Sequence, residues 1–413
     1  MRTASFVLSL LATAVLGSRC DGDGRPGPRN LIPIDDASPV FVKEVPNGKL
    51  FHVGHGDDTK DLIHVWGTPY ENGLAMGQLI GTAKFTKFIR GVYDYTEGQI
   101  ASNVANKTWC AQHSLRCNAM RSVVKGGLSV ALDLSYQRTK SFVKPYVLEE
   151  LKGLADSTGG ALGLTEIRNI MWIGEVTRGA CSMFGAKGKA TQSRGGKLLQ
   201  LRALDWDTDG PFKDFATIVV YHPNDGDGHA WANLGFSGFT GSVTGFSSRQ
   251  IGMSEIGVSF PDESFGPETY FARGYPFTYL IRDVLQFDDS LDDATQRITG
   301  ATRTCDLILG VGDGKSNDFS GFQYSPHVAN VIKPTNLLPA NDTWHPEIED
   351  VVYWGMDWVC PNDNSMLSHQ LRRYHGKLTP EITISDITSY VTTGNLHIAI
   401  YDHAALQDRK SVV

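Results

Sequence analysis

Apart from a short run at its start, this chain has no stretch of sequence that is long and apolar enough to anchor it in a bilayer. Beyond residue 17 no segment approaches the roughly 18 consecutive apolar residues that a spanning helix needs. Basic residues are also few, since 38 Lys and Arg stand against 45 Asp and Glu, and no basic stripe with interleaved aromatics occurs. We therefore predict neither a transmembrane anchor nor a nucleic-acid partner.

Several catalytic and ligand-binding signatures are missing as well. The chain has no Gly-x-Ser-x-Gly sequence, because Gly235-Phe236-Ser237-Gly238 is one residue short, and this excludes a serine nucleophile elbow. The run from Gly310 to Ser316 resembles a phosphate loop, but Leu309 stands where the first glycine is required, so we expect a turn between strands. His52 and His55 have no third ligand nearby, and we predict no metal and no cofactor.

The start of the chain has the features of a secretory signal peptide. A positively charged start, the apolar run at residues 6–16 and small residues after it predict a signal peptide over residues 1–17. Two sequons, at Asn106 and Asn341, agree with passage through the secretory route and predict a glycoprotein. We expect the protein to be secreted or lysosomal.

Cysteine is scarce, with six residues in 413, yet one cysteine carries the most informative feature of the sequence. The small residues Gly179 and Ala180 precede Cys181, so the chain is able to bend sharply and let the thiol attack the carbonyl of Ala180. Cleavage of this peptide bond leaves Cys181 as a new N-terminus. An α-amino group has a pKa of about 7.7 to 8.0 and can serve as general base for the neighbouring thiol. The sequence therefore indicates a self-processing cysteine nucleophile.

A second apolar run follows about twenty residues later. Its alternating pattern at residues 198–204 predicts a strand that pairs with the strand opening at Cys181. Such a hairpin brings Arg202 and Asp205 to the sulfur. The alternative is that Arg202 and Asp205 form a solvated ion pair at a strand end.

These residues carry a family resemblance. Cys181-Ser182 followed by Arg202-x-Leu204-Asp205 resembles the pattern of the N-terminal-nucleophile amide hydrolases related to acid ceramidase, N-acylethanolamine acid amidase and penicillin acyltransferase. The resemblance covers most of residues 60–405. It extends to a glycine-punctuated helix, a second helix, a buried strand before the nucleophile, a glycine-rich strand, a further helix and a closing strand, at residues 67–81, 149–155, 170–175, 238–245, 274–285 and 396–402.

The resemblance implies a function and a role for each residue. The Cys181 thiolate attacks the acyl-amide bond of a ceramide or another N-acyl lipid and forms a thioester, which water resolves. Arg202 favours the thiolate or polarises the carbonyl, and Asp205 holds the freed α-amino group. Alternatives are acyl transfer to an amine acceptor, a phospholipase B-like ester hydrolase, and a catalytically silent binding protein that keeps the fold.

The chain departs from the resembling enzymes at the oxyanion site. Gly355 stands where those enzymes have the Asn of a Thr-Asn-Tyr-Asp segment, so either a backbone N–H serves or another residue such as Asn362 has taken the place. Arg372 stands at the same distance after this segment as an arginine of the resembling enzymes. Glu255 is the counterpart of an acidic residue of those enzymes, although its position in the sequence is shifted. Arg372 and Glu255 are therefore candidates for substrate or oxyanion contacts.

The remaining cysteines leave several pairings open. A nucleophilic cysteine must stay unpaired, which leaves five. Cys110 and Cys117 are close enough in sequence for a local disulfide, whereas Cys20, Cys305 and Cys360 compete for one more bond. The alternative for Cys305, which precedes an apolar run, is a buried thiol.

Hydrophobic periodicity predicts helices over residues 71–100 and 119–157, strands from 170 to 260, and a mixture thereafter. The strands are expected at residues 170–176, 198–204, 216–221, 251–260, 306–311 and 396–401, with helices at 277–285 and near 384–391 and with Ser290 as N-cap of a helix over 291–298. With the resemblance, this order implies an α+β fold, a four-layer αββα sandwich with two central antiparallel sheets. We expect an N-terminal fragment, residues 18–180, and a catalytic fragment, residues 181–413. The two fragments are expected to form one domain and to stay together as a heterodimer after cleavage.

Overall fold

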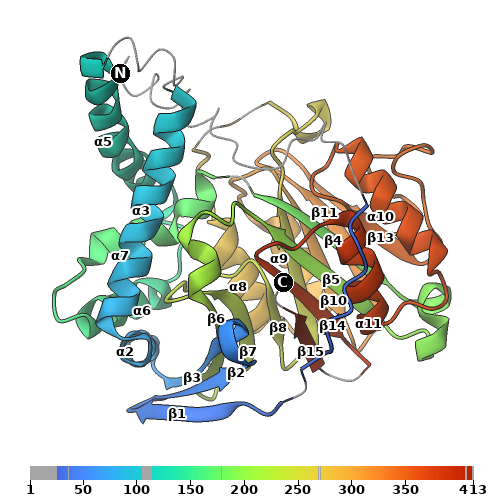
Figure 1. Cartoon of the computed structure of the whole chain (residues 1–413), viewed down its shortest axis with the longest axis horizontal. Helices are drawn as coiled ribbons and strands as arrows, with labels where there is room; N and C mark the ends of the chain where they lie inside the picture. Colours follow the sequence, from blue (N-terminus) through green and yellow to red (C-terminus); the bar gives the residue numbers. More distant parts are fainter. Residues whose placement is uncertain are drawn as a thin grey trace.

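The structure is a computed structural model that describes residues 26–35, 37–104, 114–177, 179–267, 269, 271–404 and 407–411, with no account of the side chains of 101–126 and of those after 404 (Figure 1). The expected signal peptide, Asn106, Cys20, Cys110 and the side chain of Cys117 lie outside these residues. Within them, no helix has the length and apolar character needed to cross a membrane.

Ten strands form the larger of two sheets, in the order β1-β2-β3-β6-β7-β8-β9-β10-β11-β12. Their bounds are Val40–Val45 (β1), Gly48–Val53 (β2), Lys60–Gly67 (β3), Ala216–Pro223 (β6), Trp231–Phe236 (β7), Gly245–Ser247 (β8), Ile251–Gly257 (β9), Leu307–Asp313 (β10), Asp318–Tyr324 (β11) and Ala329–Ile332 (β12). Neighbouring strands are antiparallel except β3 and β6, which are parallel. The expectation of two antiparallel sheets is wrong at this pair, because helices and the β4–β5 hairpin separate the two strands in sequence, and a long crossover permits parallel pairing.

The smaller sheet has the order β13-β4-β5-β14-β15 and is antiparallel throughout. Its strands are Val351–Trp354 (β13), Ala180–Ala186 (β4), Leu199–Asp205 (β5), His397–Asp402 (β14) and Gln407–Ser411 (β15). Strands β4 and β5 pack against β9, and β4 also meets β10 and β11. Gln200 on β5 donates from Nε2 to the Oγ of Ser254 on β9 at 2.8 Å, so a polar contact crosses the largely apolar core between the sheets.

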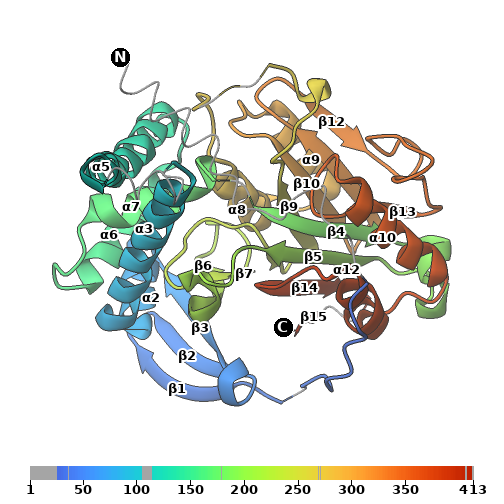
Figure 2. The same cartoon turned by 45° about the horizontal axis from the view of Figure 1, so that its top comes forward.

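Helices gather in three groups (Figures 1 and 2). Helices α8 and α9 pack on strands β8 to β12, α10 packs on β13 and on the C-terminal helical turns, and α2 packs on β1 to β3 and leads to the remaining helices. Their bounds are Pro69–Ile80 (α2), Thr82–Val104 (α3), Ser114–Thr139 (α5), Pro145–Ser157 (α6), Leu164–Met171 (α7), Phe277–Phe287 (α8), Leu291–Gly300 (α9), Pro361–Arg373 (α10), Pro380–Ile382 (α11), the π-helix Thr383–Thr388 (η6) and Ser389–Val391 (α12). The chain is therefore an α+β protein with two facing sheets.

The two long helices expected from periodicity are each interrupted. Thr68 and Glu71 form a capping box that starts α2, and Gly81, with φ of +87°, ends it before α3 begins. The second interruption lies between Thr139 and Pro145, which starts α6. Periodicity continues through the first interruption because the apolar faces of α2 and α3 point to one core, whereas Leu128 and Leu132 of α5 form a separate small cluster with Ile100.

Two predicted strands are wrong. Residues 170–176 belong to the end of α7 and to the 3₁₀ turn Ile173–Glu175, because the buried Ile167, Ile170 and Met171 have the i, i+3, i+4 spacing of a helix. Residues 238–244 form turns between β7 and β8, where Asn233 Nδ2 donates to two backbone carbonyls of the loop. Glycines in this loop serve turns rather than a strand.

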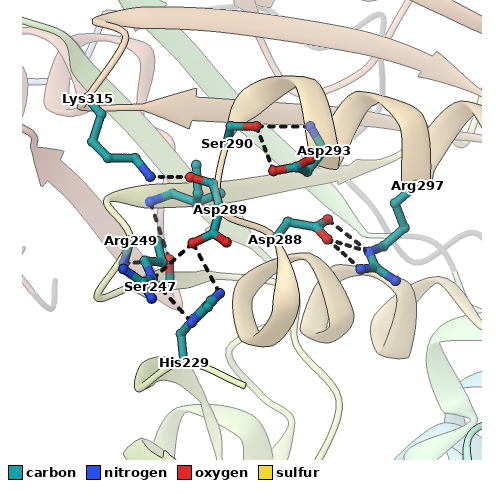
Figure 3. A network of polar contacts seen from close by, with 10 residues as sticks. His229, Ser247, Arg249, Asp288, Asp289, Ser290, Asp293, Arg297 and Lys315 are labelled. Atoms are coloured by element: carbon teal, nitrogen blue, oxygen red, sulfur yellow. Dashed lines mark hydrogen bonds and ion pairs between the residues drawn. The ribbon is translucent and has the colours of Figure 1, made fainter. Parts of the chain in front are cut away.

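The N-cap of α9 is as predicted. The Ser290 hydroxyl accepts a hydrogen bond from the backbone N–H of Asp293 at 3.2 Å, and Asp293 lies in the first turn of the helix (Figure 3). Arg297, in the last turn, forms a bidentate ion pair with Asp288. Figure 3 also shows Asp289 among His229, Arg249 and Lys315.

A segment near the start of the chain lies along the C-terminal helical turns. The backbone N–H of Gly27 donates to Tyr390 O, and that of Asn30 donates to Ser385 O, both at 3.0 Å. The guanidinium of Arg29 binds the Asp386 carboxylate through two contacts, at 2.7 and 3.0 Å. The beginning of the described chain is thus held to the helical turns that precede β14.

Candidate functional site

The β4–β5 hairpin sets the position of the predicted nucleophile. Ala180 pairs with Asp205 and Cys181 pairs with Leu204, which confirms the predicted pairing of the two strands. Side chains alternate along a strand, so Cys181, Arg202 and Leu204 project toward the larger sheet and Asp205 projects to the opposite face. Arg202 and Asp205 are therefore both close to Cys181, but on opposite sides of the sheet.

The Cys181 side chain opens onto an apolar cavity. Cys181, Arg202 and Glu255 share its wall, and its volume is about 100 Å³, which is several times what one water needs. Aromatic and aliphatic side chains form most of the remaining wall. They come from α3, α7, α8, β5, β7, β10 and the segments between, and include Phe88, Ile170, Leu204, Trp206, Phe212, Phe236, Phe239, Val243, Phe277, Leu307 and Leu396. The cavity thus combines one thiol and one ion pair with an apolar chamber.

Arg202 and Glu255 form a buried ion pair across the two sheets. Nη2 of Arg202 on β5 donates to Oε2 of Glu255 on β9 at 3.2 Å, and their side chains are 0% and 8% exposed. The other two nitrogens of the guanidinium, Nε and Nη1, have no hydrogen-bond partner among the described residues. Buried donors of a charged group are costly to leave unpaired, so they mark a place where a ligand oxygen fits.

The environment of Cys181 keeps its thiol protonated in the uncut chain. Burial raises the pKa of Cys181 to about 12, and this effect outweighs the nearby positive charge of Arg202, which lowers it. The carboxylates of Glu255 and Asp205 raise the pKa further. Since the thiolate is the nucleophile, this thiol needs a base or a change in its surroundings before it reacts at neutral pH.

Asp205 is buried and closely surrounded by hydrogen-bond donors. Its Oδ1 accepts from the backbone N–H groups of Gly394 at 2.7 Å and Asn395 at 3.3 Å, and its Oδ2 accepts from the Thr393 hydroxyl. Burial nevertheless raises the pKa of Asp205 to about 6, while these hydrogen bonds and Arg202 lower it. Asp205 is thus a carboxyl whose charge changes near pH 6, behind the strand that carries Cys181.

Met356 connects this side of the sheet with the backbone of Cys181. The N–H of Cys181 donates to Met356 O at 3.1 Å, and the N–H of Met356 donates to Ser182 Oγ at 3.2 Å. Thr393 Oγ1 lies 2.8 Å from Ser182 Oγ and also contacts Asp205. The sequence reasoning missed Ser182 and Thr393 as site residues, and only the cluster of small polar residues before β14 gave a signal for Thr393.

Neither expected oxyanion donor lies in the cavity. The N–H of Gly355 is bound by Asn364 Oδ1 at 2.9 Å, and Asn362 is exposed. Glycine is required at 355 because an added Cβ would lie 2.7 Å from the backbone oxygen of Asp363. Arg372 is exposed on α10 and does not line the cavity, so of the two weaker candidates only Glu255 is near Cys181.

Cys305 and Cys360 differ in their bonding state. Cys305 is a buried thiol, as in the second of the two alternatives, and its Sγ lies 3.4 Å from Oε2 of Glu175. Disulfide formation by Cys305 is therefore wrong, because its side chain is packed beside a carboxylate that also accepts from the N–H of Phe277. Cys360 takes part in a disulfide.

The remaining motifs have structural roles. Asp313 Oδ1 accepts from the backbone N–H groups of Lys315 and Ser316, which confirms a turn between strands in place of a phosphate loop. Asn341 lies on a turn, where its Oδ1 accepts from the N–H of Thr343 at 2.9 Å. Across the described part of the chain, no three His, Cys, Asp or Glu side chains gather as metal ligands would.

Comparison with known proteins identifies relatives over nearly the whole chain. No protein-family model matches the chain. A search of solved structures matches the Caenorhabditis elegans N-acylethanolamine-hydrolyzing acid amidase (NAAA) ortholog, with 17% identity and a TM-score of 0.41, over 56% of this chain and all of that one. Among curated proteins, dcd1B of Dictyostelium discoideum is 30% identical over 90% of this chain and 71% of its own length. Protein dcd1A of the same organism is 32% identical over 98% of this chain and 90% of its own length. The chain therefore belongs to the family of the dcd1 proteins.

Proposed function

We propose that this protein is an autoproteolytically activated cysteine amidase that hydrolyses the acyl-amide bond of a ceramide or another N-acyl lipid. The observation that carries this proposal is the shared wall of one apolar cavity, where the Cys181 thiol lies with the buried guanidinium of Arg202, whose Nε and Nη1 have no partner among the described residues. A nucleophile, a charged donor for a carbonyl oxygen and an apolar chamber for the acyl group are the parts that acyl transfer from a lipid amide requires.

Cleavage of the Ala180–Cys181 peptide bond starts the cycle in this proposal. The new α-amino group, with a pKa of about 7.7 to 8.0, takes the proton of the thiol and compensates for the burial that otherwise keeps the sulfur protonated. Asp205 lies behind the scissile residue, where its carboxylate attracts and orients the ammonium form. The uncut chain is then a dormant precursor.

The chemical steps follow from these positions. The Cys181 sulfur attacks the carbonyl carbon of the substrate amide, and Arg202 binds the oxygen as it gains negative charge. The proton held on the α-amino group passes to the nitrogen of the leaving amine, the C–N bond breaks, and a thioester remains on the sulfur. Water then attacks the thioester with the α-amino group as base, releases the fatty acid and restores the thiol.

The cavity supports a lipid acyl chain as the bound group. Its wall beyond the ion pair is aromatic and aliphatic, and each buried methylene of a bound chain contributes roughly 0.8 kcal/mol. Trp206 and Phe212 lie in the segment after β5 and line this chamber. Their rings contact each other edge to face, with centroids 5.9 Å apart. An acyl chain inside the chamber places its carbonyl at the polar end, beside Cys181 and Arg202.

Other parts of the proposal concern organisation and location. The order of α8 and α9, the larger sheet, the smaller sheet and α10 supports the four-layer αββα sandwich of the N-terminal-nucleophile hydrolases. Fragments 18–180 and 181–413 are proposed to remain a heterodimer, supported by the β3–β6 pairing and by the Arg29–Asp386 ion pair. Secretion or lysosomal location, with a signal peptide at 1–17 and glycans at Asn106 and Asn341, belongs to the same proposal.

The test combines intact mass with a substrate panel. Natural protein, Cys181→Ala and the thiol control Cys305→Ser are purified after secretion, reduced, deglycosylated and weighed. We expect two fragments that meet at Ala180/Cys181 in the natural and control proteins, and one chain in Cys181→Ala. The natural protein should release fatty acid from N-acyl amides, and the loss in kcat/KM for Cys181→Ala should be about a thousandfold or more.

Each other outcome of this test has a defined meaning. Preference for ester substrates would indicate a phospholipase B-like activity, and amide formation with an added amine would indicate acyl transfer. An uncut natural chain at both acidic and neutral pH, without release of acid from any substrate, contradicts the proposal and leaves a binding protein with this fold.

A further inference from the structure

A continuous chain of buried hydrogen bonds joins Asp205 to the backbone of Cys181. It runs from the Asp205 carboxylate to the Thr393 hydroxyl, then to the Ser182 hydroxyl over 2.8 Å, then to the Met356 N–H over 3.2 Å. The carbonyl of Met356 in turn accepts from the Cys181 N–H at 3.1 Å. Both hydroxyl side chains are almost fully buried, at 5% exposure for Thr393 and 0% for Ser182, so water does not compete for them.

The number of protons in this chain fixes its direction. Each hydroxyl has one proton to donate. When Asp205 is ionised it only accepts, so Thr393 donates to Asp205, Ser182 donates to Thr393, and the free lone pairs of Ser182 accept the Met356 N–H. When Asp205 is protonated, its own proton points to Thr393, Thr393 donates to Ser182, and the Ser182 O–H has no acceptor among these groups. A lone pair of Ser182 is available to the Met356 N–H in both states, but in the protonated state the buried Ser182 hydroxyl has an unsatisfied donor, which destabilises the arrangement. The stability of the Ser182–Met356 contact therefore depends on the charge of Asp205.

We propose that Thr393 and Ser182 are positioning residues that couple the protonation of Asp205 to the Met356 segment, and through it to the nitrogen of Cys181. This inference rests on the proposed function, because that nitrogen is both the scissile amide and the later general base. In the ionised arrangement the Met356 carbonyl is fixed, so it takes one N–H of the cysteine and leaves the nitrogen lone pair directed at the sulfur. Protonation of Asp205 loosens this arrangement.

The backbone at Met356 supports a constrained role for this segment. Met356 has φ of +64°, a left-handed conformation that costs a non-glycine residue about 1 kcal/mol or more. Surrounding hydrogen bonds offset this cost. The N–H and C=O of Met356 are both bound by residues of β4, and the N–H of Gly355 donates to Asn364 Oδ1 at 2.9 Å. A strained residue held from both sides transmits a change at Ser182 to Cys181.

Other titratable and charged groups lie near Asp205 and also affect the pH dependence of the activity. Arg202, on the same strand, lowers the pKa of Asp205, and Cys181, on β4, has its own pKa raised by Asp205. From α10, Asp363 has its pKa raised to about 7 by burial and by the charges of Asp205 and Asp357. Among the hydrogen bonds of Asp205, that of Thr393 lowers the pKa most. Removal of this one hydroxyl therefore has a specific signature.

The experiment measures two properties in Thr393→Val, Thr393→Ser and Ser182→Ala proteins. Thr217→Val is the matched control, because Thr217 is also buried and its Oγ1 lies 3.0 Å from Ser237 Oγ in the larger sheet. The first property is the pH profile of amide hydrolysis. Thr393→Val should shift the acidic limb upward by roughly one pH unit, since a hydrogen bond to a charge is lost, and Thr393→Ser should restore it. Ser182→Ala should lower the rate without moving this limb.

The second property does not depend on activity. In the Cys181→Ala background, the ¹³C carboxyl signal of Asp205, assigned by its loss in Asp205→Asn, is titrated by NMR. Thr393→Val should raise the midpoint by roughly one unit, and Thr393→Ser and Thr217→Val should not. Thr393→Ala replaces Thr393→Val where circular dichroism shows that valine disturbs the fold. If Thr393→Val leaves the Asp205 midpoint unchanged, the coupling is overturned even when the enzyme is active. If the midpoint shifts but the natural protein hydrolyses no amide, the hydrogen-bond chain is supported and only the proposed function is contradicted.

Discussion

Arg202 and Glu255 join the two sheets at the position of the Cys181 thiol, with Nη2 and Oε2 3.2 Å apart. Neither side chain reaches bulk water to an appreciable extent, so each depends on the other for its charge balance. Glu255 binds one nitrogen of the guanidinium, and the other two have no hydrogen-bond partner in the part of the chain that the structure describes. The proposed function therefore gives this pair a role in binding besides its role in stability, and the two contributions can be separated by substitution.

Arg202→Met should lower the free energy of unfolding by about 3 to 5 kcal/mol, because it leaves the Glu255 carboxylate buried without a counter-charge. The double substitution Arg202→Met with Glu255→Gln should recover part of this loss, since no buried charge remains. Urea denaturation followed by tryptophan fluorescence measures all three proteins. A double variant that is less stable than Arg202→Met would contradict the interpretation of a buried pair.

Glu255→Gln should make the Cys181 thiol more acidic. Glu255 raises the pKa of this thiol and Arg202 lowers it, so neutralising the Glu255 carboxyl removes one of the two carboxylates, Glu255 and Asp205, that oppose the effect of Arg202. Alkylation of Cys181 by iodoacetamide at pH 8 should therefore be faster in the variant, measured by peptide mass spectrometry with Cys305 as the reference thiol in the same chain. An unchanged ratio of the two rates would show that Glu255 does not act on the sulfur.

The folded chain should lose stability as pH rises from about 4 to about 7. Burial raises the pKa of Asp205 and of Asp357 to about 6, and that of Asp363 to about 7. A carboxyl with a raised pKa binds its proton more tightly when folded, so its penalty is absent below the unfolded pKa and complete above the folded one. For Asp205, about two pKa units correspond to about 3 kcal/mol.

This pH dependence is checked by comparing free energies of unfolding at pH 4 and pH 7.5 in the natural protein and in Asp205→Asn. The difference between the two pH values should be smaller in Asp205→Asn, because this variant has no proton to lose. A difference of equal size in both proteins would assign the dependence to other groups.

Val243→Phe should shorten the chamber and reduce hydrolysis of long-chain amides more than of short-chain ones. Val243 lines the cavity with Phe236 and Phe239, and the larger ring occupies space that a bound chain needs. Values of kcat/KM for a series of acyl lengths measure the effect. A uniform loss at every length would indicate that the chain binds elsewhere.

Ser290→Ala should cost about 1 kcal/mol of stability and leave cleavage at Ala180–Cys181 unchanged. The serine caps α9, as Figure 3 shows. Helix α9 packs on β10 to β12, and Ser290 does not line the cavity. Thermal unfolding measures the stability, and Ser290→Thr, which keeps a capping oxygen, is the control. A change in cleavage would show that stability loss alone affects the site.

The sequence was most informative where structure is local. The hairpin of Cys181 and Arg202 was predictable because its two strands follow one another, and the N-cap at Ser290 needs only the four residues after it. Residues 170–176 were predicted to form a strand, although they belong to the end of α7 and the 3₁₀ turn after it, because a short apolar run fits either period and only the burial pattern distinguishes the two.

Long-range contacts could not be predicted in this way. Glu255 meets Arg202 because β9 faces β5 across the sheet interface, and Thr393 meets Asp205 because the loop before β14 returns beside β5. Both relationships depend on strand order, which the sequence does not encode locally. Arg372 illustrates the reverse case, since its register resembles the family while its helix places it on the surface.

The parallel pairing of β3 with β6 has a consequence for biosynthesis. During translation, β1, β2 and β3 leave the ribosome well before β6 is made, because α2 to α7 and the β4–β5 hairpin lie between them. Until then β3 presents an open edge, and the exposed apolar side chains of Val40 and Phe41 lie on β1, at the other edge of this three-stranded part of the sheet. The larger sheet can therefore be completed only after β4 and β5 have been made, and until then the edge of β3 is open to pairing with other chains.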